Sequence, residues 1–268
     1  MSTVQPNHGH VREPQALLLL HGFPFNAAMW REQIDFLDAC GVPVLAPDLR
    51  GLGENRFDGE VATMDDMARD VAVLLDESAV NRAIICGLSM GCYVAFEFVQ
   101  LFRPRVDALI LCGPRAQGPD AAERRSREEQ ARRALVEGMD FALESISTKL
   151  LAEHTLTQKP DVVKRVREMV LSTDPCGAAA AQRGMAVRRD YADDLLHIEV
   201  PTLIIAGRED GVRTPEDGEF VRRRIRGAKQ VVIDDAGHLM NMEQPEVFNR
   251  VLTDFIRTIK HEVSEARP

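Results

Sequence analysis

The 268-residue sequence has few aromatic residues and no long hydrophobic run. Aromatic residues make up 5% of the chain, with one tryptophan and two tyrosines. The apolar run at residues 16–20 is too short to form a membrane-spanning helix or the core of a signal peptide, and the residues before it are polar. The sequence therefore predicts a protein that neither spans a membrane nor carries a secretion signal.

Cysteine is also scarce, and its positions do not form a metal-binding or disulfide pattern. The five cysteines are odd in number and include no C-x-x-C pair and no Cys/His cluster. Cys86, Cys92 and Cys112 lie in apolar segments that we expect to be buried. This usage is typical of reduced core residues, so we expect a cytoplasmic protein without a metal or other cofactor.

The sequence lacks an excess of basic residues. It has 42 Asp and Glu against 33 Lys and Arg, which gives a formal net charge of -9. A basic surface is needed to bind phosphates, so this balance argues against nucleic acid as a partner. We interpret the basic run at residues 222–226 as a solvated helix face. We expect a small-molecule substrate and a monomer or small homo-oligomer.

Short apolar runs alternate with helical patterns along most of the chain. The runs predict strands at residues 16–20, 43–46, 83–86, 107–112, 202–206 and 230–233. The patterns between them predict helices at about 27–40, 64–78, 90–102, 215–226 and 245–260. Apolar runs without polar alternation suit parallel strands that are covered on both faces. The sequence therefore predicts an α/β fold with a mostly parallel central sheet and helices on both faces.

Residues 114–198 interrupt this alternation. The segment is rich in Ala, Arg and Glu and predicts helices at about 119–136, 138–152, 160–172 and 177–188. A helical insertion between strands of a parallel sheet is expected to lie over the carboxyl ends of the strands, where such folds bind ligands. We therefore predict a core domain of residues 1–113 and 199–268, with residues 114–198 inserted as a helical cap.

The pentapeptide Gly87-Leu88-Ser89-Met90-Gly91 is a G-x-S-x-G motif between an apolar run and a helical pattern. This context is typical of a nucleophile elbow, a sharp turn that exposes the serine hydroxyl. The serine backbone is strained in such a turn, and side chains at the glycine positions would collide with the neighbouring strand and helix. We interpret Ser89 as a nucleophile.

An acid and a histidine follow Ser89, each just past a predicted strand. They are Asp210 and His238, and the order Ser-Asp-His is the one found in α/β-hydrolases. An imidazole can take the serine proton, and a buried carboxylate orients the imidazole and stabilises its charged form. Ser89 would then attack a carbonyl to form an acyl-enzyme, and water activated by His238 would release the acid.

Two backbone amides are candidates for stabilising the oxyanion of this reaction. Met90 follows the nucleophile at a helix start, where the helix dipole favours negative charge. The second donor should come from the loop after the first predicted strand, His21-Gly22-Phe23-Pro24. Proline has no N–H, so we predict the amide of Phe23. We interpret His21 as support for this loop rather than as a base.

The His21–Pro24 loop, the segment Asp48–Gly53, the elbow and the two downstream sites together resemble the α/β-hydrolase superfamily. The likeness covers residues 16–258, and the insertion is similar to those of small-cap carboxylesterases and 3-oxoadipate enol-lactonase-like hydrolases. The resemblance favours Asp210 over Glu209 as the acid and implies that Asp48 is structural. It also implies an antiparallel strand pair before residue 16, which is shortened or missing here.

Several neighbouring acids and cavity candidates remain to be assigned. We interpret Asp234 and Asp235 as turn residues. Arg115 and Arg133 could bind a substrate carboxylate, but we favour solvated helix charges. We interpret the cap methionines and the tryptophan mainly as core residues, with a pocket-lining role as the alternative; they are Met139, Met169, Met185 and Trp30.

We predict a serine carboxylesterase for short- to medium-chain esters, with an apolar pocket under the cap. An enol-lactone hydrolase is an alternative, and a ligand-sensing protein on the same fold is a third. A serine nucleophile argues against the haloalkane dehalogenases and epoxide hydrolases of the superfamily.

Overall fold

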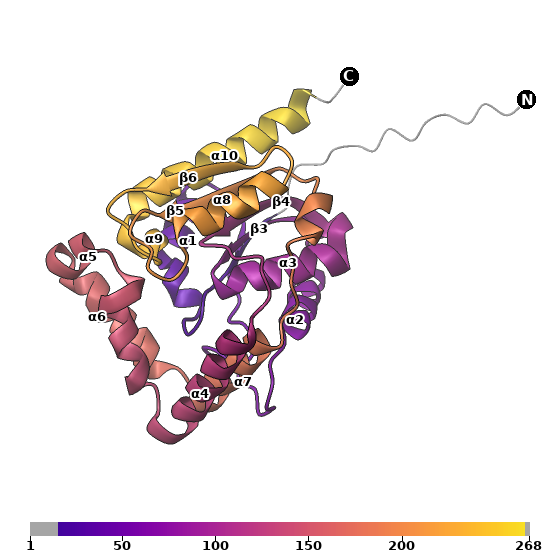
Figure 1. Ribbon diagram of the computed structural model, residues 1–268. Coiled ribbons are helices and arrows are strands. Elements are labelled where there is room, and N and C mark those ends of the chain that lie inside the picture. Colours follow the sequence, from indigo (N-terminus) through magenta and orange to yellow (C-terminus); the bar gives the residue numbers. More distant parts are fainter. Residues whose placement is uncertain (1–15, 266–268) are drawn as a thin grey trace, which may run out of the picture.

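Six strands form one parallel sheet in the computed structural model, which describes residues 16–265 (Figure 1). Every neighbouring pair in the order β2-β1-β3-β4-β5-β6 is parallel, which confirms the predicted parallel sheet. The strand pair implied before residue 16 falls outside the described residues. The strands are β1 (Ala16–Leu20), β2 (Val44–Leu45), β3 (Ala83–Leu88), β4 (Val106–Cys112), β5 (Thr202–Gly207) and β6 (Lys229–Ile233).

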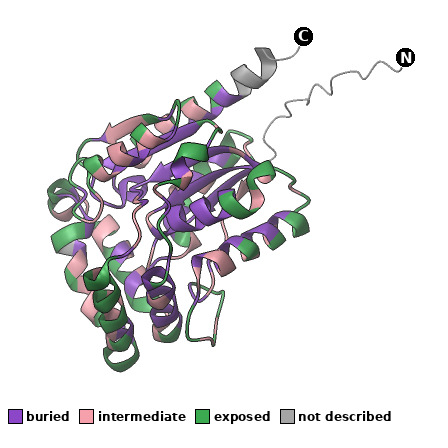
Figure 2. Cartoon of the chain, turned by 45° about the vertical axis from the view of Figure 1, so that its right-hand side comes forward, coloured by how far each residue is buried: buried purple, intermediate pink, exposed green. Residues whose placement is uncertain are grey.

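Helices cover both faces of the sheet. Successive residues of a strand point to opposite faces, and these strands are apolar on both, so both faces are buried. On β1, Leu18 and Leu20 join one buried cluster, while Leu17 and Leu19 join the other. The first cluster is completed by α2 (Met64–Glu77), α3 (Met90–Phe102) and α8 (Pro215–Arg224). The second is completed by η1 (Ala27–Trp30), α1 (Arg31–Ala39), α9 (Met240–Glu243) and α10 (Pro245–Glu265). Figure 2 shows buried residues concentrated in the strands and exposed residues along the outer helices.

Six helical elements form most of the segment between β4 and β5. The helices α4 and α7 pack against each other, and Figure 1 shows this pair extending away from the sheet. The six are α4 (Ala121–Glu137), the 3-10 turn η3 (Asp140–Leu143), the π-helical turn η4 (Ile146–Leu150), α5 (Glu153–Gln158), α6 (Pro160–Ser172) and α7 (Pro175–Ala186). Two further 3-10 turns precede strands: η2 (Arg103–Arg105) comes directly before β4, and η5 (Asp194–His197) ends the same segment before β5.

The predicted continuous helix at 138–152 is wrong. Gly138 ends α4 with φ at 72°, a left-handed conformation that stops a helix. The chain then forms only the short turns η3 and η4. The predicted helix at 27–40 is likewise divided into η1 and α1. None of the helices within residues 16–265 is both long and apolar enough to cross a membrane.

Candidate active site

Ser89 lies at the sharp turn between β3 and α3, as the elbow motif predicts. Its φ of 55° and ψ of -107° are unusual for a residue with a side chain. A Cβ on Gly87 would collide with the carbonyl of Gly91, and one on Gly91 would collide with the carbonyl of Leu20. The Ser89 amide donates a 2.9 Å hydrogen bond to the carbonyl of Cys112 on β4, which fixes the turn to the sheet.

Asp210 and His238 lie beyond the carboxyl ends of β5 and β6 and form a buried pair. The distance from Nδ1 of His238 to Oδ2 of Asp210 is 2.7 Å, and the two residues are 2% and 4% exposed. The other carboxylate oxygen, Oδ1, accepts the amides of Val212 and Arg213 at 2.8 and 2.7 Å. These bonds fix the carboxylate, and they leave Nε2 as the ring nitrogen of His238 that is available for proton transfer.

The competing acids have other partners. The carboxylate of Glu209 accepts the amide of Glu153 at the start of α5, at 3.0 Å. Asp234 forms an exposed ion pair with Arg208. Asp235 has φ at 52°, as expected of a turn residue. Of these candidates, Asp210 alone is bonded to His238.

His21 supports its loop, as predicted. Its Nε2 accepts the amide of Leu49 at 2.8 Å, and its Nδ1 lies 3.0 Å from the carbonyl of Gly22. Both contacts are satisfied by a neutral ring that carries its proton on Nδ1. Burial lowers the pKa of His21 to about 4, which keeps the ring neutral near pH 7. Asp48 is structural too, since its carboxylate accepts the amides of Ala27 and Glu54 at 2.7 and 2.8 Å.

The two predicted oxyanion donors, the amides of Phe23 and Met90, come from the loop after β1 and from the elbow itself. Met90 is the first residue of α3, directly after Ser89. Phe23 borders the same cavity as Ser89 and His238. Within residues 16–265, neither amide donates a hydrogen bond to the protein. Both N–H groups therefore lack a protein acceptor in this part of the chain.

Glu243 is a site residue that sequence reasoning missed. Its buried carboxylate accepts the amides of Gly237 and Leu239, on either side of His238, at 2.9 and 3.1 Å. It also accepts the amide of Ala152, in the helical insertion, at 2.8 Å. Burial raises the pKa of Glu243 even though these amides favour its charged form. The sequence offered one signal, an acidic residue close to apolar ones. No sequence motif identifies a carboxylate that accepts hydrogen bonds from backbone amides, so its role was not predicted.

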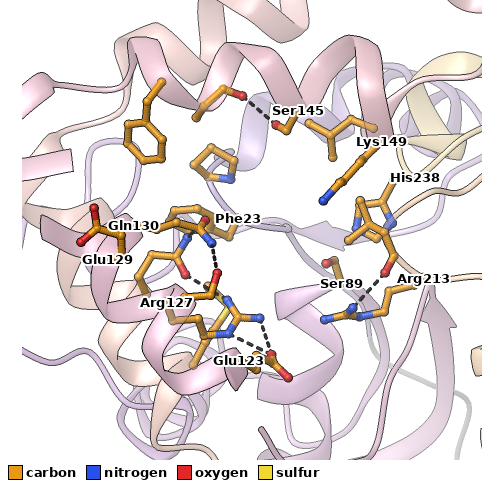
Figure 3. Close-up of a pocket in the computed structure, with 18 of the residues that line it drawn as sticks. Phe23, Ser89, Glu123, Arg127, Glu129, Gln130, Ser145, Lys149, Arg213 and His238 are labelled. Carbon is orange, nitrogen blue, oxygen red and sulfur yellow. Dashed lines mark hydrogen bonds and ion pairs between the residues drawn. The ribbon is translucent and has the colours of Figure 1, made fainter. Parts of the chain in front are cut away.

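A cavity of about 840 Å³ opens above Ser89 and is lined by both the strand ends and the insertion. Figure 3 shows Ser89, His238 and Arg213 on one side, with Arg127 and Gln130 of α4 facing them. The lining combines the expected apolar surface with many charged groups that the sequence did not predict. Ten of its side chains are acidic, basic or histidine: Arg115, Asp120, Glu123, Arg127, Glu129, Arg133, Glu144, Lys149, Arg213 and His238.

Of the other residues considered for the cavity, some line it and others are buried in the hydrophobic core. Arg133 is paired with Glu137 at 2.8 Å and is a solvated helix charge, as predicted. Met185 borders the cavity, whereas Met139 is buried in the core. Trp30 is fully buried and packs against Phe248. Within residues 16–265, no cluster of three or more His, Cys, Asp or Glu is arranged to hold a metal ion.

Comparison with known proteins decides the family. A family model described as alpha/beta hydrolase fold matches residues 15–245. The chain belongs to this family. It is 26% identical over 237 residues to 3-oxoadipate enol-lactonase 2 of Acinetobacter baylyi, covering 88% of this chain and 86% of that protein.

Two solved structures share the fold of this α/β hydrolase closely. A thermophilic esterase from Thermogutta terrifontis, with malate bound, is 39% identical with a TM-score of 0.89, over 92% of this chain and 91% of that one. The enol-lactonase from Burkholderia xenovorans LB400 is 26% identical with a TM-score of 0.83, over 92% of each chain. The relatives thus include both esterases and lactonases.

Proposed function

We propose that this protein is a serine carboxylesterase in which Ser89, Asp210 and His238 form the catalytic triad. The observation that carries the proposal is the buried 2.7 Å bond between His238 and Asp210, beside a cavity that also exposes Ser89. The three residues come from the ends of β3, β5 and β6, which lie at one edge of the sheet. The 39% identity to a structurally characterised esterase supports the same assignment.

In the proposed reaction, Nε2 of His238 takes the proton of Ser89 as the hydroxyl oxygen attacks the ester carbonyl. The imidazolium that forms is stabilised by the carboxylate of Asp210. His238 then gives the proton to the leaving alcohol, and an acyl group remains on Ser89. Nε2 of His238 next takes a proton from water as the water oxygen attacks the acyl carbonyl. The bond to the Ser89 oxygen breaks, His238 returns the proton to that oxygen, and the carboxylic acid is released.

The amides of Phe23 and Met90 serve as the oxyanion hole in this proposal. Both are free of protein acceptors within the described residues, and Met90 adds the dipole at the start of α3. Preorganised donors of this kind each contribute about two to three orders of magnitude in rate. Residues 114–198 act as a cap, since α4 and η4 supply much of the cavity wall.

The test is turnover of p-nitrophenyl esters of increasing acyl length by the wild type and by Ser89→Ala. We expect hydrolysis by the wild type and a loss of at least about 10⁴-fold in kcat in the variant. Matched circular dichroism spectra would show that the fold is kept. Equal turnover by the two proteins would overturn the assignment of Ser89.

Lactone hydrolysis is a second candidate, favoured by relatives named as 3-oxoadipate enol-lactonases. The same triad would open a cyclic ester, because the acyl-enzyme step is unchanged and the leaving alcohol stays tethered. A lactone panel run beside the ester series distinguishes the two. A kcat/KM for a lactone well above that for the best open-chain ester would favour the lactonase.

A further inference from the structure

Arg213 is a cavity cation without a carboxylate partner in the described part of the chain. It follows Asp210 by three residues and lies beside Ser89 in Figure 3. Its Nη1 donates to the carbonyl of Val212 at 2.8 Å, and its Nη2 donates to the hydroxyl of Tyr93 at 3.0 Å. Both acceptors are neutral, and a guanidinium has five N–H donors. These neutral acceptors hold the guanidinium in place, and the carboxylates of Glu123 and Asp217 act on it only from beyond ion-pair distance.

The other arginines near the cavity differ in this respect. Arg127 and Arg188 both bond to the carboxylate of Glu123, at 2.9 and 3.0 Å. Arg133 is paired with Glu137 at 2.8 Å. These ion pairs explain the three arginines as structural, since they lie along α4 or join α4 to the segment that follows α7. Arg213 has no such explanation.

Tyr93 adds a second polar group at the same place. It lies in the first turn of α3 and lines the same cavity as Ser89. Its hydroxyl accepts from Arg213 and still has its own proton to donate. The guanidinium of Arg188 lies over the Tyr93 ring, with Cζ 4.4 Å from the centroid, which adds positive charge to this end of the cavity.

Cations are crowded here relative to anions. Glu123 is the one carboxylate shared by Arg115, Arg127 and Arg188. Burial lowers the pKa of Arg127, and the neighbouring Arg188 lowers it further. A partly buried cation that lacks a counter-ion is costly, and a bound anion would relieve that cost. A carboxylate suits the planar guanidinium because it can accept two parallel hydrogen bonds.

We infer that Arg213, together with the hydroxyl of Tyr93, binds a free carboxylate of the substrate. The substrates are then esters or lactones that carry a second, unesterified carboxylate, such as half-esters of dicarboxylic acids. The inference deepens the proposed function and rests on it for the reaction, but the binding of the carboxylate can be tested without turnover.

The kinetic test compares methyl hydrogen glutarate with methyl pentanoate, which differ by a carboxylate in place of a methyl group. We expect the wild type to prefer the half-ester by at least about tenfold in kcat/KM, as one charge-assisted hydrogen bond would give. Arg213→Gln should lower that preference about 10- to 100-fold, and Tyr93→Phe should lower it less. Arg213→Lys keeps the charge and should restore part of the preference.

The matched control is Arg133→Gln, which also removes one cavity charge but one that is already paired with Glu137. Its preference should stay within about twofold of the wild type, because exposed ion pairs contribute little. An unchanged preference in Arg213→Gln, or an equal loss in Arg133→Gln, would overturn the inference.

The binding test uses glutarate titrated by calorimetry into Ser89→Ala and into Ser89→Ala with Arg213→Gln. We expect the second protein to bind glutarate at least about tenfold more weakly. Equal affinity would overturn the anion site whatever the turnover. Failure of the proposed function looks different: the wild type would hydrolyse no ester, or Ser89→Ala would still do so, while glutarate binding still depended on Arg213.

Discussion

The two walls of the cavity are built differently. The strand-end wall carries Ser89, Asp210 and His238, and its polar groups are fixed by hydrogen bonds to the backbone of buried loops. The facing wall, from α4 to η4, carries many charged side chains, and several of them are held by ion pairs. Backbone bonds within a packed core fix a side chain more closely than ion pairs at the surface do.

This difference matches two separate tasks, the chemistry of the reaction and the selection of the substrate. Bond-making groups need positions fixed to within about half an ångström, which the sheet edge provides. Groups that select the substrate tolerate more variation, and short helices between two strands can change without disturbing the sheet. Arg213 lies in the strand-end wall, but its proposed role is to select the substrate.

Asp210→Asn tests the strand-end wall with a change of one functional group. An amide cannot stabilise the imidazolium of His238 and favours the wrong tautomer, so kcat should fall about 10⁴-fold. Glu209→Gln is the matched control, because its amide oxygen can still accept the amide of Glu153. Its kcat should stay within about threefold of the wild type, since it changes no buried charge at the site. Similar losses in the two variants would contradict the choice of Asp210.

Substitution of Glu243 tests the link between the two walls, because its carboxylate bonds both to the loop of His238 and to Ala152 of the insertion. Glu243→Ala leaves the buried amides of Gly237, Leu239 and Ala152 without their acceptor. The free energy of unfolding should fall by about 3 to 5 kcal/mol, since each unsatisfied group costs about 1–3 kcal/mol. Because the amides flank His238, kcat should fall more than KM rises.

The measurements for Glu243 are urea denaturation and steady-state kinetics over a range of pH. Glu243→Gln keeps one carbonyl acceptor and should recover part of both losses. Glu246→Ala, at an exposed position three residues on, should change neither. If Glu243→Ala loses stability while kcat and its pH profile are unchanged, Glu243 does not position His238.

His21 gives the smallest effect, through the pH dependence of stability. Burial lowers its pKa in the folded state to about 4, against about 6.5 when unfolded. The unfolded chain therefore binds the extra proton between these values. The stabilisation is fully present above pH 6.5 and is lost as pH falls to 4, by up to about 3 kcal/mol.

His21→Gln removes this titration while keeping one donor and one acceptor. We expect its stability to fall less than that of the wild type between pH 7 and pH 4.5, as measured by urea denaturation. His154→Gln changes an exposed histidine on α5 and should leave the wild-type slope intact. Parallel slopes for all three proteins would contradict the role of His21.

The sequence predicted the strand-end wall well, because its signals are local. Apolar runs locate the strands, the elbow motif places Ser89 after β3, and the chain order places Asp210 and His238 beyond their strands. The same parallel sheet then brings all three residues to one edge. The catalytic roles of these residues remain predictions until the variants are measured.

The facing wall was predicted less well, for physical reasons. Where Pro160 marks a helix start, α6 has the predicted bounds, because proline favours the first helical position. The six residues of α5 are too few to show a helical period, and Gly138 breaks the helix expected over 138–152. Charges occur all around α4, so its sequence did not show which side chains would line the cavity.

The central claim is that Ser89 forms a covalent acyl-enzyme, and rapid acid quenching followed by mass spectrometry tests it most directly. The wild type is mixed with p-nitrophenyl acetate, quenched within the first turnovers and digested into peptides. We expect one acetyl group per molecule, on Ser89, together with a matching burst of p-nitrophenol. Steady release of p-nitrophenol with an acetyl group on another residue, or on none, would contradict the account.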